Sequence, residues 1–598
     1  MRRSTTAATA LLLGAATLAS AQTYQRLGTC PKLGCVFPPD QTEFLAGQLF
    51  DIRLEVHAPV NGSEATNGVP DEKFTFCIQG GNGPCEDATK FFKAKEPALE
   101  KWTFQYYEDL FARDAKTPTV VNVTSKAYRA LSLAQPGSYT AKLSYNGGGQ
   151  TVANWVVRKP ATDRRAKNVL FFIGDGMTQA MITAARLIAH KSINGKYQSL
   201  MQMDQMDNLG HQMTHSIDSF ITDSANSATA LYTGKKSTVN ALGVYVDSSK
   251  NSFDDPKVET IAELFRRRIG GALGIVSTAY IADATPAGLC SHTRDRGQYA
   301  SIVTEYLYNA TFLNSTFAWP TSCQGPDVIF GGGAEQFIAG TGSPNGTDFY
   351  KAFQAQGYNA RQKKGKGEGW FMMSEAASID KMMHVLDYDR ALGDLLELDN
   401  TIRASIAHLK EIGEYENTLI VVTADHGHGF DVFGGADTKY LAAQSTDRKK
   451  RDAVGVYVNS GLSGYTVAPG SLPNNQTVVF GSEGPNFPVQ WNPRYTYAAG
   501  FGANPDHRET YSISTKGPRV PATAGADGTY VVNPADNQAG FTVEGTLPTD
   551  EPQGVHSLTD VSVFANGPGA EAFKGVYNSI DIFFKIADAL ALGRTDGT

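Results

Sequence analysis

Two apolar segments, far apart in the chain, each end in side chains that can bind a metal ion. Residues 168–177 are Asn-Val-Leu-Phe-Phe-Ile-Gly-Asp-Gly-Met, and residues 417–429 are Asn-Thr-Leu-Ile-Val-Val-Thr-Ala-Asp-His-Gly-His-Gly. Each apolar run is long enough for one fully buried strand, which is typical of parallel sheets covered on both faces. Ligands gather at the carboxyl ends of such strands, where Asp175, Asp425 and His426 follow. Because carboxylates and imidazoles bind divalent cations, the pattern predicts a metal site.

A third apolar run, Gly369–Met373, also leads to an acid, Glu375, and is followed by Asp380 and His384. If residues 376–384 are helical, Asp380 and His384 share one face, since they are four positions apart. That spacing suits two ligands of one zinc ion and leaves Glu375 for another ion. A solvated helix surface is the alternative, but the position directly after a buried strand favours the ligands.

Thr222-Asp223-Ser224-Ala225 precedes a helical stretch that runs to Thr233. Asp and Ser are preferred helix caps, so an ordinary cap is one interpretation. The other places Ser224 at a helix N-terminus, where free N–H groups and the helix dipole favour an anion. A serine held there could serve as an activated nucleophile.

The elements that must position these residues alternate between strands and helices, which predicts an α/β fold with a mainly parallel central sheet and helices on both faces. The strands are expected at 168–173, 271–277, 327–331, 369–373 and 418–423, and the helices at 227–233, 258–266, 388–410 and 580–592. Residues 430–553 are rich in Gly, Pro, Asn and Tyr and are interpreted as an excursion from this sheet.

Residues 22–160 differ in pattern and predict a small β-rich domain. Phe50–Val56 alternates apolar and polar residues, as a half-buried antiparallel strand does. Further strands are expected at 74–77, 138–143 and 150–157, and a helix at 98–112. The polar, proline-containing segment 158–165 is the expected linker to a catalytic domain over residues 165–598.

The chain of 598 residues carries a net charge of −7, so no general attraction to nucleic acid or anionic lipid is expected. Two arginines, an apolar stretch and Ala19-Ser20-Ala21 predict a signal peptide over residues 1–21, cleaved after Ala21, and therefore a secreted protein without a membrane anchor.

Six cysteines fit an oxidising compartment, and proximity suggests the pairs 30–35, 77–85 and 290–323, although spacing alone does not settle connectivity. Six glycosylation sequons begin at Asn61, Asn122, Asn309, Asn314, Asn345 and Asn475. Residues 448–451 fit either a dibasic processing site or a solvated loop.

The motifs occur in the order found in alkaline phosphatases, and residues 165–592 resemble that family. They are Gly-Asp175-Gly, Asp223-Ser224-Ala, Asp283-Ala-Thr285-Pro, Glu375-Ala-Ala-Ser-Ile-Asp380-Lys-x-x-His384, Thr-Ala-Asp425-His426-x-His428 and His556. The region before them resembles the extensions of some fungal secreted members.

The resemblance implies two zinc ions and one magnesium ion per chain. It implies Asp380, His384 and His556 at the first zinc, Asp175, Asp425, His426 and Ser224 at the second, and Asp175, Thr285 and Glu375 at magnesium. Arg296 corresponds to the arginine that binds phosphate, and Asp223 is expected to help orient the phosphate. Asp283 and Lys381 resemble the bacterial type of the family: Lys381 would reach phosphate through water, and Asp283 would hold a magnesium-bound water. A solvated lysine is the alternative for Lys381. His428 is either a residue that orients an acid or an ordinary buried histidine.

The implied activity is hydrolysis of small phosphate monoesters through a phosphoserine on Ser224, with broad specificity for the alcohol. Relatives that hydrolyse phosphodiesters, phosphonates or sulfates are the nearest alternative, but they generally lack the third-metal residues Thr285 and Glu375. A binding protein that attaches through residues 22–160 to a wall or surface partner is a second alternative. The sequence also leaves a homodimer open.

Overall fold

The computed structural model describes Cys30 and residues 33–107, 118–189, 200–308, 319–323, 325–357, 368–385, 387–432, 445–449 and 554–596, with seven short strands between residues 466 and 543. The predicted signal peptide, the sequons at Asn309, Asn314 and Asn475, Lys450 and Arg451 lie outside these ranges, as does most of the predicted excursion.

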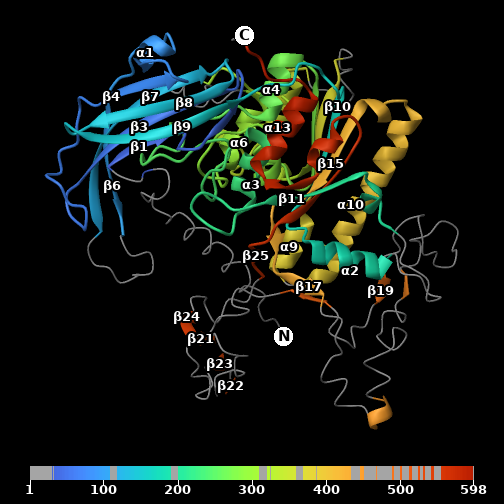
Figure 1. The fold of residues 1–598 in the computed structure, drawn as a ribbon. Helices are drawn as coiled ribbons and strands as arrows, with labels where there is room; N and C mark the ends of the chain where they lie inside the picture. The colour runs from blue at the N-terminus through green and yellow to red at the C-terminus, as the bar shows by residue number, and fades with distance from the viewer. Residues whose placement is uncertain are drawn as a thin grey trace, which may run out of the picture.

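An eight-stranded sheet forms the centre of the catalytic region (Figure 1). Its order is β13 (Val328–Gly332), β12 (Ala272–Tyr280), β14 (Trp370–Ala376), β10 (Asn168–Gly174), β15 (Thr418–Thr423), β26 (Val561–Asn566), β11 (Asn208–Met213) and β27 (Gly575–Asn578). Strands β13 to β15 pair in parallel, and β26 is antiparallel to both of its neighbours. The predicted mainly parallel sheet is confirmed.

Helices cover both faces of this sheet, which explains the uninterrupted apolar runs. All seven residues of β10 are buried; Val169 and Phe171 pack in one hydrophobic cluster, and Leu170 and Phe172 pack in another. The first cluster includes α3 (Ser224–Thr233), α4 (Ile261–Ile269), α5 (Ala284–Ala287), α6 (Tyr299–Leu307), α8 (Phe349–Ala355) and α13 (Ile580–Ala589). The second includes α2 (Gln179–Ala189), α9 (Ser378–His384) and α10 (Tyr388–Glu411). Successive side chains of a strand point to opposite faces, so a cover on both faces favours apolar residues at successive positions.

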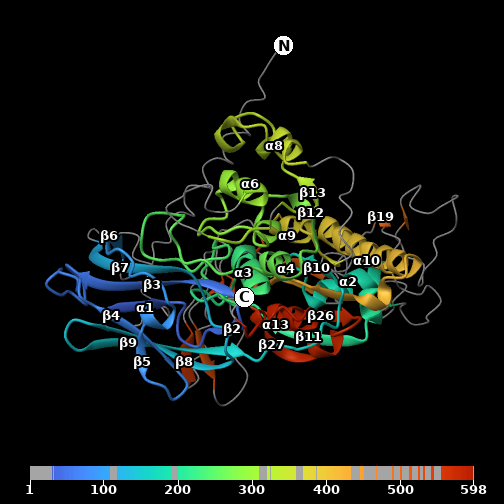
Figure 2. The same cartoon turned by 90° about the horizontal axis from the view of Figure 1, so that it is seen from above.

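Two further sheets, drawn in blue, lie beside the catalytic region in both views (Figures 1 and 2). One contains β1 (Gly34–Phe37), β3 (Leu49–Pro59), β7 (Thr119–Ser132) and β6 (Glu100–Tyr106). The other contains β2 (Glu43–Leu45), β9 (Gly149–Arg158), β8 (Gly137–Tyr145), β4 (Thr75–Gly80) and β5 (Cys85–Asp87). Their inner faces share one hydrophobic cluster, as in a sandwich.

Two expectations for the N-terminal region are wrong. The predicted helix at 98–112 contains β6, which pairs with β7 over residues 100–106; its alternating apolar residues, including Trp102 and Phe104, suit a strand. The alternating segment 50–56 lies within β3, but β3 is not half-buried, because ten of its eleven residues are buried. Its acidic and basic side chains Asp51, Arg53 and Glu55 face the catalytic region instead of solvent.

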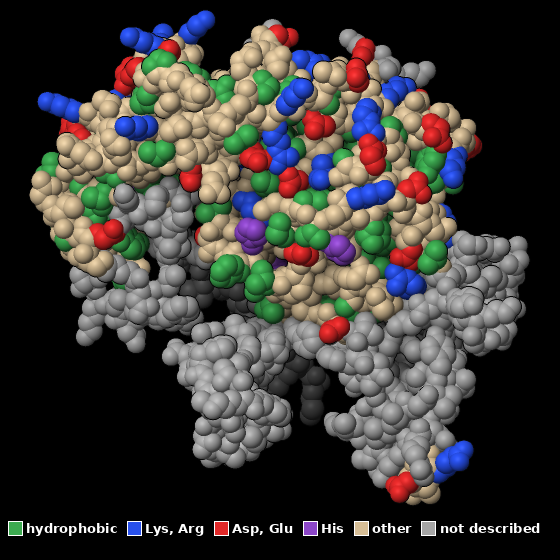
Figure 3. Space-filling view, viewed as in Figure 1, with side chains coloured by type: hydrophobic (Ala, Val, Ile, Leu, Met, Phe, Trp, Pro, Cys, Tyr) green, Lys and Arg blue, Asp and Glu red, His purple; other side chains and the backbone are tan. Residues whose placement is uncertain are grey.

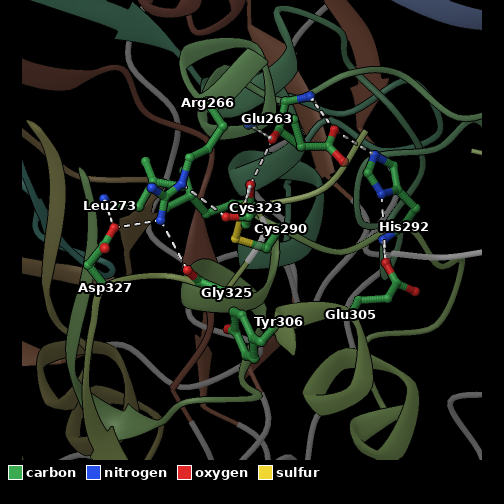
Figure 4. The surroundings of a disulfide bond; sticks show 12 residues. Glu263, Arg266, Leu273, Cys290, His292, Glu305, Tyr306, Cys323, Gly325 and Asp327 are labelled. Atoms are coloured by element: carbon green, nitrogen blue, oxygen red, sulfur yellow. Dashed lines mark hydrogen bonds and ion pairs between the residues drawn. A yellow bond between two sulfur atoms is a disulfide. The ribbon is translucent and has the colours of Figure 1, made fainter. Parts of the chain in front are cut away.

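Disulfides join the three cysteine pairs that sequence proximity suggested: Cys30–Cys35, Cys77–Cys85 and Cys290–Cys323. Near the last of them, Arg266 donates to the carbonyls of Cys323 and Gly325 at 3.1 and 3.0 Å (Figure 4). Arg266 therefore ties Cys323 and Gly325 to α4, while the disulfide joins Cys323 to Cys290, beyond the end of α5. None of the helices within the described ranges combines the length and hydrophobicity that a bilayer span requires.

Candidate active site

The predicted chemical groups meet at one edge of the central sheet. Asp175 follows the end of β10, and its backbone N–H donates to the Ala376 carbonyl of β14 at 3.1 Å. Glu375 on β14 pairs in register with Ile173 of β10. Asp425 lies two residues beyond the end of β15, the other neighbour of β10. The parallel register thus brings acids from three strands together.

A small antiparallel pair, β16 (Gly427–His428) and β25 (His556–Ser557), brings the late histidine to the same edge. His428 is directly opposite His556, and the ring of His556 stacks on that of His426 with centroids 3.7 Å apart. The contact joins two parts of the chain that are well over a hundred residues apart.

Three histidines are oriented as metal ligands usually are. Their Nδ1 atoms face backbone carbonyls: His384 to Gly554 at 2.9 Å, His426 to Gly427 at 3.2 Å and His556 to Thr222 at 2.7 Å. A carbonyl only accepts hydrogen bonds, so each Nδ1 carries a proton and, in a neutral ring, Nε2 presents a lone pair. The Nε2 atoms of His384 and His556 face each other at 3.1 Å, an arrangement that a cation between them would stabilise.

The donor atoms form two compact groups. Those of Asp380, His384, His428 and His556 lie within 4.8 Å of one another, as do those of Asp175, Asp425 and His426. In the second group, His426 Nε2 lies 3.3 Å from Asp175 Oδ1, 3.4 Å from Asp425 Oδ2 and 3.2 Å from Ser224 Oγ.

These groups fit divalent cations. Among the described residues, Asp175 Oδ1, Asp425 Oδ2 and Thr285 Oγ1 are buried and make no hydrogen bond. Burial, together with neighbouring carboxylates, raises the pKa of Asp175 well above its usual range and that of Asp425 to about 6. Buried carboxylates with unused oxygens are held in their charged form by a metal ion.

Glu375 provides a further oxygen beside these groups. It accepts a hydrogen bond from Ser277 Oγ at 2.5 Å, and burial raises its pKa to about 8. Ser277 lies on β12, directly opposite Glu375 in the parallel register. Glu375, Thr285 and Asp175 have the all-oxygen composition that magnesium prefers.

Ser224 is the first residue of α3, and Asp223 is its N-cap, accepting from Asn226 N at 3.0 Å. Both interpretations of this segment therefore describe the same helix start. Ser224 is 3% exposed, and its Oγ lies beside His426 at the end of the helix where N–H groups are free. The hydroxyl is thus placed where an oxyanion is stabilised.

Cationic side chains meet at two acids next to the serine. Arg296 donates to Asp223 Oδ2 at 3.2 Å and to Asp283 Oδ1 at 2.9 Å, and Lys381 donates to Asp283 Oδ2 at 2.5 Å. Burial opposes ionisation of Asp283, but Arg296 and Lys381 outweigh it and lower the pKa of this carboxyl. A planar guanidinium held in this way suits two phosphate oxygens.

Histidine side chains reach the surface near the middle of the face in Figure 3, among acidic and hydrophobic side chains.

All fourteen site residues proposed from the sequence lie in this region, but two details were missed. His428 belongs to the group around Asp380, with its Nε2 3.6 Å from Asp380 Oδ1; its signal was the short His-x-His spacing from His426. Ser277 was not proposed as a site residue. Its signal was its position at the end of a predicted parallel strand.

Comparisons with known proteins agree with this geometry. A family model described as "Alkaline phosphatase" matches residues 166–364 and 360–592, more than half of the chain, and one described as "PhoA-like N-terminal domain" matches residues 33–158. Streptomycin-6-phosphate phosphatase of Streptomyces griseus is 28% identical over 350 residues, covering 45% of this chain and 75% of that protein. Alkaline phosphatase of Escherichia coli (strain K12) is 28% identical over 408 residues, covering 54% and 82%.

Among solved structures, alkaline phosphatase of Thermus thermophilus is similar at a TM-score of 0.45 and 17% identity, covering 72% of this chain and 93% of that one. The extent of the family match, together with the ordered motifs at one sheet edge, establishes the relationship. The chain belongs to the alkaline phosphatase family.

Proposed function

We propose that this chain hydrolyses phosphate monoesters by way of a phosphoserine on Ser224. The observation that carries the proposal is the convergence, around one serine at a helix start, of two metal-ligand groups and a partly exposed arginine. The family is that of metal-dependent phosphomonoesterases, so the class of reaction follows from membership. The role of each residue is our proposal.

Two zinc ions and one magnesium ion are the proposed cofactors. Asp380, His384 and His556, with His428 beside them, would hold the first zinc, and Asp175, Asp425 and His426 the second. Glu375, Thr285 and Asp175 would hold magnesium. When bound, these cations stabilise negative charge on the oxygens next to them.

The residues of the chain position both reactants. Arg296 would bind two non-bridging phosphate oxygens, while Asp223 and Asp283 fix its orientation, and Lys381 adds positive charge on the same side. Ser224 Oγ, deprotonated, forms a bond to phosphorus while the bond from phosphorus to the ester oxygen breaks, and the departing alcohol takes a proton from solvent. Water then attacks phosphorus, the bond to Ser224 Oγ breaks, and phosphate is released.

Specificity for the alcohol is expected to be broad. The contacts proposed above all involve phosphate or Ser224, and none involves the alcohol part of the substrate. We also propose that residues 22–160 and 165–598 form the two domains, joined at the segment between the end of β9 and the start of β10.

Trapping the intermediate tests this proposal. A ³²P-labelled phosphomonoester, quenched in acid, should label the metal-loaded enzyme but not Ser224→Ala, which removes one small hydroxyl. The matched control is Ser227→Ala, three residues further along α3, which should keep the label. Label that persists in Ser224→Ala, or a faster reaction on a phosphodiester than on a monoester, would refute the proposal.

A further inference from the structure

The polar face of β3 is buried against the catalytic domain. Asp51, Arg53, Glu55 and His57 alternate along the strand and are at most 1% exposed. Asp51, Arg53 and Glu55 contact residues 247–259: for example, Asp51 N donates to the Lys257 carbonyl at 2.8 Å, and Glu55 accepts from Ser248 N at 2.9 Å. His57 instead pairs with Glu55 within its own region. Burying charged groups is costly unless they are paired, so this interface depends on its specific partners.

Arg53 is the central residue of this face. Its Nε donates to Asp247 Oδ2 at 2.7 Å, and its Nη2 lies 2.9 Å from Asp254 Oδ2, both in the catalytic domain. Its Nη1 donates to Glu100 Oε2, on β6 of its own domain, at 2.7 Å. The buried guanidinium thus connects the N-terminal sheet to one loop of the catalytic domain.

Asp247 connects Arg53 to a second arginine, Arg294. Its other oxygen, Oδ1, accepts from Arg294 Nη2 at 2.8 Å, and Arg294 also makes two hydrogen bonds to Asp255, at 2.7 and 2.6 Å. Burial opposes ionisation of Asp247, but Arg53 and Arg294 outweigh it and lower its pKa to about 2. Three clustered acids could suggest a cation site, but guanidinium groups already neutralise them here.

Arg294 lies two residues before Arg296. Residues 240–242 contact the backbone near both arginines. Thr293 and Leu242 exchange two backbone hydrogen bonds, at 2.9 and 2.7 Å. Arg296 N donates to the Asn240 carbonyl at 3.1 Å, and Asn240 N donates to Asp223 Oδ2 at 3.1 Å. The segment 240–258 therefore contacts Arg53 at one end and the backbone of Arg296 at the other.

We propose that Arg53 is a positioning residue for phosphate binding: through Asp247 and Arg294, the N-terminal domain fixes the orientation of Arg296. The inference rests on the proposed role of Arg296 as a phosphate ligand. A bidentate clamp requires its two N–H groups at set positions, and a small displacement of its backbone misplaces both. The N-terminal domain thereby contributes to the active site without reaching it.

A double-mutant cycle on the full, metal-loaded chain tests this. Arg53→Met should raise the inhibition constant for inorganic phosphate, and the KM for a monoester, by roughly tenfold, with a smaller change in kcat. In an Arg296→Ala background, Arg53→Met should have no further effect, since its influence passes through Arg296. The matched control is Arg158→Met, which removes another ion pair between the domains, to Asp581 at 2.5 Å, and should leave the inhibition constant unchanged.

An unchanged inhibition constant in Arg53→Met, or an equal effect in the presence and absence of Arg296, would overturn the inference while leaving the proposed function intact. An unchanged constant in Arg296→Ala would instead refute the role of Arg296 and the inference with it. If Arg53→Met does not fold, Asp247→Asn replaces it in the same cycle. That substitution keeps the side-chain size and removes the charge between the two arginines, so the same non-additive result is expected.

Discussion

Asp283 accepts a hydrogen bond from Arg296 Nη2 at 2.9 Å, so an acid that follows β12 orients the guanidinium proposed to bind phosphate. Its second oxygen is used by Lys381. The carboxylate therefore separates two cations that would otherwise repel each other beside the serine.

Replacing Asp283 should weaken phosphate binding. Asp283→Asn keeps the size of the side chain but loses the charge that aligns Arg296, and we expect the inhibition constant for phosphate to rise by about tenfold to a hundredfold. Competition assays measure this directly. Asp295→Asn, an exposed acid next to Arg296 in sequence, is the control; if both variants bind phosphate as the parent does, Asp283 does not orient the arginine.

Replacing Ser277 should weaken magnesium binding and leave zinc binding unchanged. Its hydroxyl favours the ionised form of Glu375, and loss of a hydrogen bond to a charged group costs about 2 kcal/mol, or more than tenfold in affinity. Elemental analysis of Ser277→Ala after dialysis against micromolar magnesium should show less magnesium and unchanged zinc. Ser562→Ala, which removes a buried hydroxyl on β26, should change neither, and equal magnesium in all three proteins would contradict the assignment.

Removal of the metal ions should abolish activity and lower the melting temperature. Without cations the buried carboxylates Asp175, Asp425 and Glu375 lose their neutralising charge, and ligands that bind only the folded state stabilise it. Treatment with a chelator, followed by calorimetry and assay, tests this, and added zinc and magnesium should restore both properties. Full activity of a protein shown to be metal-free would exclude the proposed chemistry.

Glu263 should make stability fall as the pH rises. It forms a capping box with Thr260 at the start of α4 and accepts from Trp319 Nε1 at 3.0 Å, near His292 (Figure 4). Burial raises its pKa from 4.5 to about 7. Between these two values the folded state keeps a proton that the unfolded chain has lost, so up to about 3 kcal/mol of stability is lost across the window.

Glu263→Gln resembles the protonated acid and should remove this dependence. We expect the variant to melt close to the parent at pH 5 and above it at pH 8, in buffer saturated with zinc and magnesium. The difference between the two proteins reports Glu263 together with His292, whose pKa Glu263 raises, and cancels the other titrating groups. Parallel melting curves over the whole range would show that Glu263 is ionised in the folded protein.

The catalytic sheet was predictable because its strands carry strong local signals. Strand β15 begins and ends at Thr418 and Thr423 as expected, and apolar runs that are buried on both faces have few alternative interpretations. The acids that follow them were identified for the same reason, since parallel strands end at a common edge. Residue types and order therefore predicted the α/β fold and brought the proposed metal ligands to one edge of the sheet.

Only the tertiary structure decided which strands pair and what covers the polar face of a strand. The segment 98–112 carries an ambiguous apolar pattern, and pairing with β7 makes residues 100–106 a strand. The alternation along β3 predicted a solvated face, but contacts with residues 247–259 bury it. Such contacts link positions about two hundred residues apart, and periodicity reports only that a face is polar, not what covers it. The sequence thus predicted the groups that we propose do the chemistry, and only the packing of the two regions showed which residues lie between Arg53 and Arg296.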